Sequence, residues 1–193
     1  MAIQPCTFDG WQQAGAPQVW LVQGLAEDRD QARQQARAAL RACLAPALGC
    51  GADALQVTNV RGQAPRLLMR GRPLPQSHCS ISHAPGLALL AWRREGPVGV
   101  DIQALDGFAP RRELEAVAHL FLAQETARML MDTAPDALFF EKFTQAWTLH
   151  EARLKCAGLD LVEWSERLPA RLAQMRSAAV PLARGYAGAV AWR

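Results

Sequence analysis

The chain has 193 residues, half of them apolar, which is enough for one sizeable core or two packed lobes. No window approaches the roughly 18 apolar residues of a membrane span, and the N-terminus lacks a basic-then-apolar signal pattern, so we expect a cytoplasmic protein without membrane association. The five cysteines are odd in number and form no C-x-x-C pair, which argues against a disulfide framework or a zinc knuckle.

The net charge of +3 comes from 19 arginines and two lysines, Lys142 and Lys155, against 18 acidic residues. Such a small surplus points only weakly to anionic partners. Four arginines recur at every fourth position from Arg29 to Arg41. This spacing favours the solvated face of a helix over a nucleic-acid surface, which would cluster arginines with stacking aromatic residues. We therefore expect no nucleic-acid partner.

The first regular element is a helix over residues 28–48, predicted from alanine, leucine and cysteine at helical spacing. Asp28 or Asp30 can cap its start, and Gly49 can end it. Pro46 should end or kink the last turn, because proline cannot donate the hydrogen bond that continues a helix.

Strand-like segments follow the helix. Residues 55–70 shorten into strand-like pieces, and glycine and two prolines in 70–75 interrupt any regular element, so a basic loop is expected there. Three further runs, 78–82, 87–92 and 98–102, are separated by short turn-forming stretches. Their spacing predicts an antiparallel meander.

Two helices are predicted next. The first covers residues 110–130 with a break near 121–124, and the second covers 137–157. Asp136 is the expected cap of the second helix, and Gly158 provides its stop.

The C-terminus echoes an earlier segment, because the strand-like runs ending at Arg93 and at Arg193 both close with Ala-Trp-Arg. We expect an α+β fold of two similar halves, each an antiparallel sheet plus helices, related by a pseudo-twofold axis. The N-terminal lobe would be 1–95 and the C-terminal lobe 96–193, with a ligand site in the cleft between them. The alternative is two unrelated alanine-rich strands.

Glu151 lies one turn beyond Trp147 on a helix with apolar neighbours, so its carboxylate should point inward and need a partner. Asp101, at the end of a strand, is the best candidate to share a site with it, because a cation can neutralise two close carboxylates and oxygen ligands suit Mg²⁺. The alternative is that Glu151 pairs with Lys155 one turn later and Asp101 caps a turn. Trp147 is expected in the core.

Two segments resemble the signature motifs of the 4′-phosphopantetheinyl transferase superfamily. Val-Gly-Val-Asp-Ile-Gln at 98–103 resembles G-x-D-x-E, and Trp-Thr-Leu-His-Glu-Ala-Arg-Leu-Lys at 147–155 resembles W-x-x-K-E-A-x-x-K. Gly-Arg-Pro at 71–73 and Ser-Ile-Ser-His at 80–83 precede them, and 119–125 is similar to the family's helix with an aromatic pair and a later acid. The mid-chain position of the first motif implies the single-chain, two-lobed type, whose fold is the one expected above.

The resemblance implies an enzyme of the holo-[acyl-carrier-protein] synthase type. It would transfer the 4′-phosphopantetheine moiety of coenzyme A to a serine of an apo acyl, aryl or peptidyl carrier protein and release 3′,5′-ADP. Its Mg²⁺ would be held by Asp101, Glu151 and Gln103. Glu151 would also act as the base, directly or through water, with Glu125 as a second candidate, and Lys155 would approach the phosphates. We expect a monomer.

The coenzyme A contacts implied by the resemblance come from Arg72, Pro73, Ser82, His83 and Lys155. His83 and Arg72 would contact the 3′-phosphate of the adenosine. Without the family, His83 could merely cap a strand in a tight turn, and Arg72 could be an idle surface residue.

Two positions depart from the family pattern. Gln103 stands where the first motif usually has Glu, and His150 replaces the first Lys of the second motif. The first change removes a negative ligand, and the second places a mostly neutral group where an ammonium is expected. A second function therefore stays open, namely a catalytically impaired coenzyme A or carrier-protein binding module of the same fold. A third, a basic nucleic-acid binder, predicts a steep salt dependence and no metal dependence.

Overall fold

The computed structural model describes residues 1–58, 60, 63–105 and 109–193. In chain order the elements are β1 (Ala2–Pro5), β2 (Gln18–Gln23), α1 (Arg29–Ala47), the 3₁₀ helix η1 (Ala52–Ala54), β3 (Leu55–Val57), β4 (Leu67–Met69), β5 (Arg72–Pro73), β6 (His78–Ala84), β7 (Leu87–Arg93), β8 (Val98–Ala104), α2 (Arg111–Phe121), α3 (Gln124–Met131), α4 (Asp136–Ala157), α5 (Leu168–Leu172), β9 (Arg176–Ala179) and β10 (Tyr186–Trp192). Within these ranges the strands form a sheet of order β1-β2-β7-β6, a sheet of order β8-β10-β9 and a small sheet of order β3-β4-β5. The antiparallel sheets and their helices confirm the predicted α+β class.

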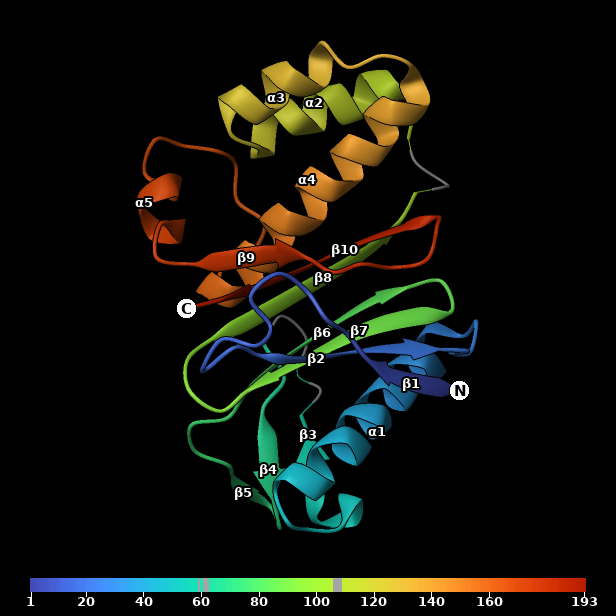
Figure 1. Cartoon of the computed structure of the whole chain (residues 1–193), viewed down its shortest axis with the longest axis vertical. Coiled ribbons are helices and arrows are strands. Elements are labelled where there is room, and N and C mark those ends of the chain that lie inside the picture. The colour runs from blue at the N-terminus through green and yellow to red at the C-terminus, as the bar shows by residue number, and fades with distance from the viewer. Residues whose placement is uncertain (59, 61–62, 106–108) are drawn as a thin grey trace.

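The two larger sheets are stacked, with α4 on the outer side of one and α1 on the outer side of the other (Figure 1). Their inner faces share one apolar core, to which β2, β7, β8 and β10 contribute Val19, Leu21, Leu89, Val98, Val100, Ile102 and Val190. The strands of one sheet come from residues 2–93 and those of the other from 98–192. The shared core therefore joins segments from both sides of the expected lobe boundary.

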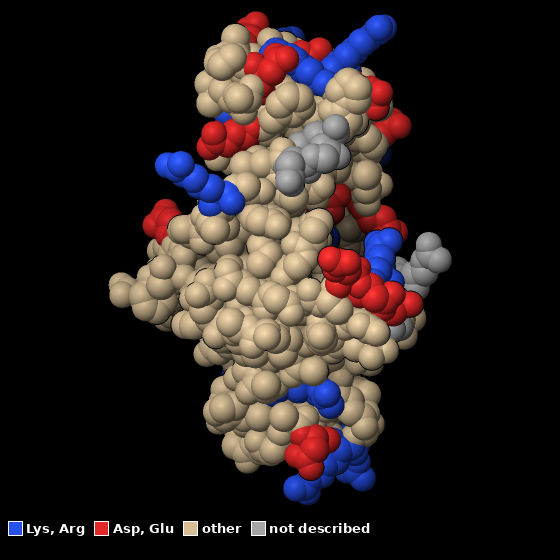
Figure 2. Space-filling model, turned by 90° about the vertical axis from the view of Figure 1, so that its right-hand side faces the viewer, with Lys and Arg blue, Asp and Glu red and all other residues tan. Residues whose placement is uncertain are grey.

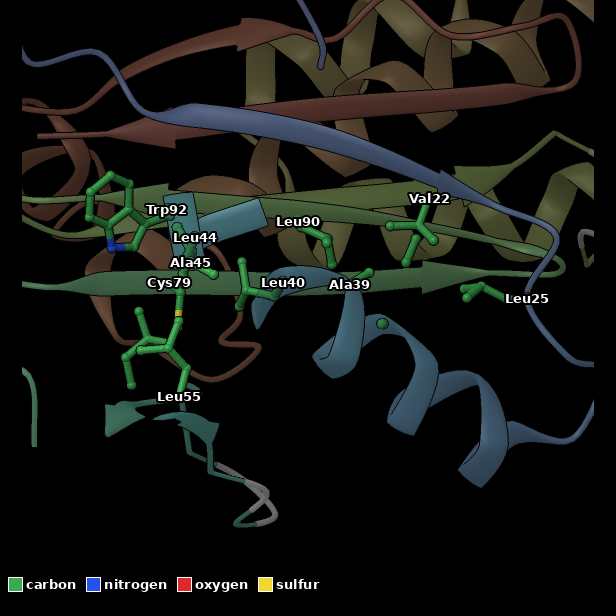
Figure 3. Close-up of a cluster of buried hydrophobic side chains, with 13 residues drawn as sticks. Val22, Leu25, Ala39, Leu40, Leu44, Ala45, Leu55, Cys79, Leu90 and Trp92 are labelled. Carbon is green, nitrogen blue, oxygen red and sulfur yellow. The ribbon is translucent and has the colours of Figure 1, made fainter. Parts of the chain in front are cut away.

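Helix α1 begins as the sequence predicts. The Asp28 side chain accepts a hydrogen bond from the Gln31 backbone N–H at 2.8 Å, which satisfies one of the unpaired donors of the first turn. Leucines and alanines at helical spacing then face the sheet. Figure 3 shows this cluster, to which α1 contributes Leu40 and Leu44 and β7 contributes Leu90. The amphipathic pattern thus fixes which side of α1 is buried.

The two halves repeat one order of elements. In the first half, β2, α1, β6 and β7 give a sheet order of β2-β7-β6; in the second, β8, α4, β9 and β10 give β8-β10-β9. The last strand of each half is antiparallel to both neighbours and carries the Trp92 or Trp192 of the Ala-Trp-Arg echo near its end. This shared topology favours the predicted internal repeat over two unrelated strands.

The predicted meander is wrong at its third strand. β6 and β7 pair antiparallel as expected, but β8 pairs with β10 and belongs to the other sheet. Side chains link β6 to β8, because Ser80 Oγ accepts from the Val100 N–H at 3.1 Å and Ser82 Oγ accepts from the Ile102 N–H at 3.4 Å. Local spacing identified the strand but not its partner, since β10 lies far along the chain.

Most helix boundaries match the prediction, and two details differ. α2 ends at Phe121 and α3 begins at Gln124, which confirms the expected break. Asp136 is the first residue of α4 and Pro135 precedes it, so Asp136 is not the cap. Two residues of the expected basic loop form β5, whereas Gly158 ends α4 at φ 65° as predicted. Among the described residues no helix is long and apolar enough to cross a membrane.

Candidate active site

Helix α4 crosses strand β8 at Gly99. A β-carbon on Gly99 would collide with the carbonyl oxygen of Ala152 and crowd the backbone nitrogen of Cys156. Because this position has no side chain, the helix backbone approaches the strand directly. The Cys156 thiol also donates to the Pro97 carbonyl at 3.5 Å. The last turns of α4 are therefore held against the strand residues that follow Gly99.

This crossing brings the two predicted carboxylates to one ammonium. Lys155 Nζ lies 2.6 Å from Asp101 Oδ1 and 3.7 Å from Glu151 Oε2. Ser82 Oγ donates to Asp101 Oδ1 at 2.7 Å and lies 3.4 Å from Lys155 Nζ. The pair of Glu151 with Lys155 considered from spacing does form, but the same ammonium also contacts Asp101. Residues of β6, β8 and α4 thus meet in one polar cluster.

The cluster is largely removed from solvent. Asp101 is only 5% exposed and the Glu151 side chain 22% exposed. Burial raises the pKa of Glu151, Lys155 opposes the rise, and the charge of Asp101 adds to it. A carboxyl with a raised pKa is a stronger base than a solvated one, which suits proton abstraction.

A pocket of about 800 Å³ opens beside this cluster, between the start of α1 and the turn after β6. It is lined by Glu27, Arg29, Arg33, Ser82, His83 and Gly86, among others. Burial lowers the pKa of His83 to about 4, assisted by the positive charges of Arg33, Arg37, Lys155 and Arg29. Figure 2 shows a hollow on its right-hand side bordered by side chains of both charges, whereas the middle of that face carries none.

The spacing of the α1 arginines predicts a solvated helix face, but it does not predict their position beside His83. Arg29 and Arg33 line the pocket, and together with Arg37 they act electrostatically on His83. Their four-residue repeat showed that they share one helix face. Only the packing of α1 on the sheet shows that this face borders His83.

Two comparisons with known proteins agree with this geometry. A family model described as the 4′-phosphopantetheinyl transferase superfamily matches residues 97–184, which include Asp101, Glu151 and Lys155. A curated protein of Synechocystis sp. (strain ATCC 27184 / PCC 6803 / Kazusa), whose name proposes it as a 4′-phosphopantetheinyl transferase, is 32% identical over 126 residues. The match covers 63% of this chain and 47% of that relative, so the chain spans about half the relative's length.

Over residues 97–184 the chain therefore resembles the 4′-phosphopantetheinyl transferase superfamily. Both segments that carried the resemblance lie within the matched region, and the fold brings their acidic residues together. Gly99 of the first motif is required by the packing, because only a residue without a side chain permits the contact with α4.

Among the described residues, no group of three or more His, Cys, Asp or Glu side chains could hold a metal ion. Asp101 and Glu151 nevertheless converge on one cation, the ammonium of Lys155. Mg²⁺ is commonly held by one or two carboxylates together with waters and substrate phosphates. These two carboxylates therefore fit Mg²⁺ when phosphate and water oxygens complete its shell.

The remaining site residues that the resemblance predicts are more dispersed. Gln103 lies two residues beyond Asp101 on β8, so the two side chains share a strand face. Glu125 is exposed in the first turn of α3. Arg72 and Pro73 form the exposed strand β5 of the small sheet, a different sheet from that of His83. No described interaction joins Arg72, Pro73 or Glu125 to the polar cluster.

His150 and Trp147 lie on the aromatic side of α4. Trp147 stacks on Phe143 at 5.9 Å and meets Phe121 edge-on at 6.0 Å, so it packs against the apolar core but is only partly buried. Burial lowers the pKa of His150, with a smaller effect from Arg153, so this imidazole is neutral near pH 7 as expected. Its buried Nε2 has no hydrogen-bond partner among the residues that the structure describes.

Proposed function

We propose that this protein transfers the 4′-phosphopantetheine moiety of coenzyme A to a serine of an apo acyl, aryl or peptidyl carrier protein, with Mg²⁺ as cofactor and 3′,5′-ADP as product. The observation that carries the proposal is the convergence of Asp101 and Glu151, one from each motif, on the same ammonium. The match of residues 97–184 to the transferase superfamily and the similarity to the curated relative support the reaction class.

The pocket beside His83 supports coenzyme A as the donor. Arg29 and Arg33 offer planar, permanently charged donors to phosphate oxygens. His83, with its pKa near 4, is neutral at pH 7 and contributes a hydrogen bond rather than a charge. The charge that attracts a phosphate would therefore come from α1, which modifies the expectation that His83 and Arg72 provide it.

In the proposed reaction the carrier serine oxygen forms a bond to the phosphorus next to pantetheine. The bond from that phosphorus to the bridging oxygen of the pyrophosphate breaks, and 3′,5′-ADP leaves. Glu151, directly or through water, accepts the serine proton, for which its raised pKa is suited. Lys155 donates hydrogen bonds to the phosphates, and Ser82 orients Asp101 through their 2.7 Å hydrogen bond. Bound Mg²⁺ would neutralise charge on the pyrophosphate.

The test incubates the purified protein with coenzyme A, Mg²⁺ and a panel of apo carrier proteins, and mass spectrometry detects the added phosphopantetheine. Asp101→Ala and Glu151→Ala should each lower the rate by about 100-fold or more, because each removes a cation ligand or the proton acceptor. Glu141→Ala is the matched control, since Glu141 is an exposed acid on the same helix. Circular dichroism checks that the variants are folded.

One observation favours a second function, the binding module without catalysis. Gln103 and His150 replace charged residues of the family motifs, and the described residues offer only two carboxylates for the metal. Coenzyme A binding in calorimetry without transfer to any carrier protein would support the module. Transfer by the wild type with activity unchanged in both alanine variants would show that the site is misplaced.

A further inference from the structure

Lys155 occupies the point where the two carboxylates meet. Its Nζ lies 2.6 Å from Asp101 Oδ1, 3.7 Å from Glu151 Oε2 and 3.4 Å from Ser82 Oγ. The Lys155 side chain is 33% exposed, more than the side chains of Asp101 at 7% and Glu151 at 22%. It is the only cation for which an ion pair with either carboxylate is described.

A metal ion held by both carboxylates would need the same oxygens. Mg²⁺ binds oxygen at about 2.0–2.1 Å, so an ion on Asp101 and Glu151 would lie within contact distance of an ammonium that kept its present bonds. Two cations that share these ligands repel each other strongly in a partly buried site. The ammonium must therefore move before both carboxylates can bind the metal.

We propose that Lys155 is the built-in counter-cation of the ligand-free site, which neutralises Asp101 and Glu151 until Mg²⁺ displaces it. This inference rests on the proposed Mg²⁺ site. The displaced ammonium stays close to the phosphate pocket, because Lys155 already acts electrostatically on His83. One side chain would thus serve the carboxylates before the metal binds and the substrate phosphates afterwards.

The exchange couples the metal to the substrate. Without coenzyme A, Mg²⁺ has to break the ion pair of Lys155 with Asp101, so the metal should bind weakly. With coenzyme A present, the phosphates offer the ammonium a new partner, and the same displacement costs less. Coenzyme A and Mg²⁺ should each strengthen the binding of the other by an equal factor.

The test is calorimetric titration of the full chain with MgCl₂ in the absence of coenzyme A. Lys155→Met keeps the length of the side chain and removes its charge, so Mg²⁺ no longer competes with an ammonium. We expect the Kd for Mg²⁺ to fall by about tenfold, the usual scale of coupling between two ligands of one protein. Lys142→Met is the control, because Lys142, the only other lysine, lines a separate groove on α4. The Kd of Lys142→Met for Mg²⁺ should equal that of the wild type.

A second measurement uses the wild-type protein, in case Lys155→Met does not fold. With only two lysines, ¹⁵N-lysine labelling gives two side-chain ammonium signals, which Lys142→Met assigns. The signal of Lys155 should shift as MgCl₂ is added, and that of Lys142 should stay in place.

Equal Mg²⁺ affinity in wild type and Lys155→Met, or a Lys155 signal that does not move at saturating Mg²⁺, would overturn the counter-cation role and leave the proposed transferase intact. Absence of Mg²⁺ binding with and without coenzyme A would overturn both the role and the metal site. The mass-spectrometric transfer assay reports independently on the proposed reaction.

Discussion

His83 illustrates how charge and burial act on a single side chain. Its pKa of about 4 follows first from burial and then from the positive charges of α1 and Lys155. The unfolded chain takes up a proton near the ordinary value of about 6.5, before the folded protein does. His83 should therefore stabilise the fold fully above pH 6.5 and lose that contribution as the pH falls toward 4. Part of the ring remains exposed, so added salt should weaken the effect of the arginines.

Arg33→Gln should raise the pKa of His83, because Arg33 contributes the largest of the charge effects that lower it. The measurement is an NMR titration of the imidazole in the wild type and the variant. Arg41→Gln is the matched control, since Arg41 lies two turns further along α1 and is not among the groups that act on His83. Superimposable titration curves for wild type and Arg33→Gln would contradict the described position of α1.

Among the contacts between secondary-structure elements, that of α4 with β8 depends on Gly99. Gly99→Ala places a methyl group against the carbonyl oxygen of Ala152, so the helix must shift away from the strand. Such overpacking commonly costs about 1–3 kcal/mol, and we expect a loss of stability in this range by urea unfolding. Transfer activity should fall as well, because Glu151 and Lys155 move with the helix away from Asp101.

Gly51→Ala is the control for this variant. The nearest atom to its added methyl group is the Asp53 carboxylate oxygen, at the end of a flexible surface side chain that can move. We expect a stability change within about 0.5 kcal/mol, as for most surface substitutions. A Gly99→Ala protein as stable as Gly51→Ala would show that the helix does not approach β8 so closely.

The whole molecule is joined by contacts between its halves in addition to the shared core. Phe8 meets Trp192 edge-on at 5.5 Å, the Tyr186 hydroxyl donates to the Pro85 carbonyl at 3.2 Å, and the Arg93 guanidinium donates to the backbone carbonyl of Arg193. Since each sheet buries its inner face only against the other, we expect neither half to be stable alone. Thermal unfolding should be a single cooperative transition, with equal calorimetric and van't Hoff enthalpies.

Two alanine variants test whether the halves unfold together. Ile102→Ala lies in the core between the sheets, and Leu40→Ala lies in the core under α1. Each removes buried methyl groups and should cost about 2–5 kcal/mol. In both variants the whole transition should move to lower temperature. Two resolved transitions in either variant would mean that the halves unfold independently.

Local patterns in the sequence determined the helices, most strands and the candidate carboxylates. The period of the apolar residues identified α1 and α4, because a helix that packs on a sheet must present one apolar face. The motif resemblance identified Asp101, Glu151 and Lys155, and the echo at Trp92 and Trp192 indicated two halves with one topology. These features are local or are carried by the order of residues along the chain.

Only the tertiary structure decided which of these elements meet. β8 left the expected meander to pair with β10, the arginines of α1 came to border His83, and Ser82 became a hydrogen-bond partner of Asp101. Each of these contacts joins segments distant in sequence, and spacing along the chain does not specify the partner of a strand edge or a helix face. For the same reason the ion pair of Lys155 with Asp101 emerged from the packing of α4 on β8 at Gly99, whereas its pair with Glu151 followed from helical spacing alone.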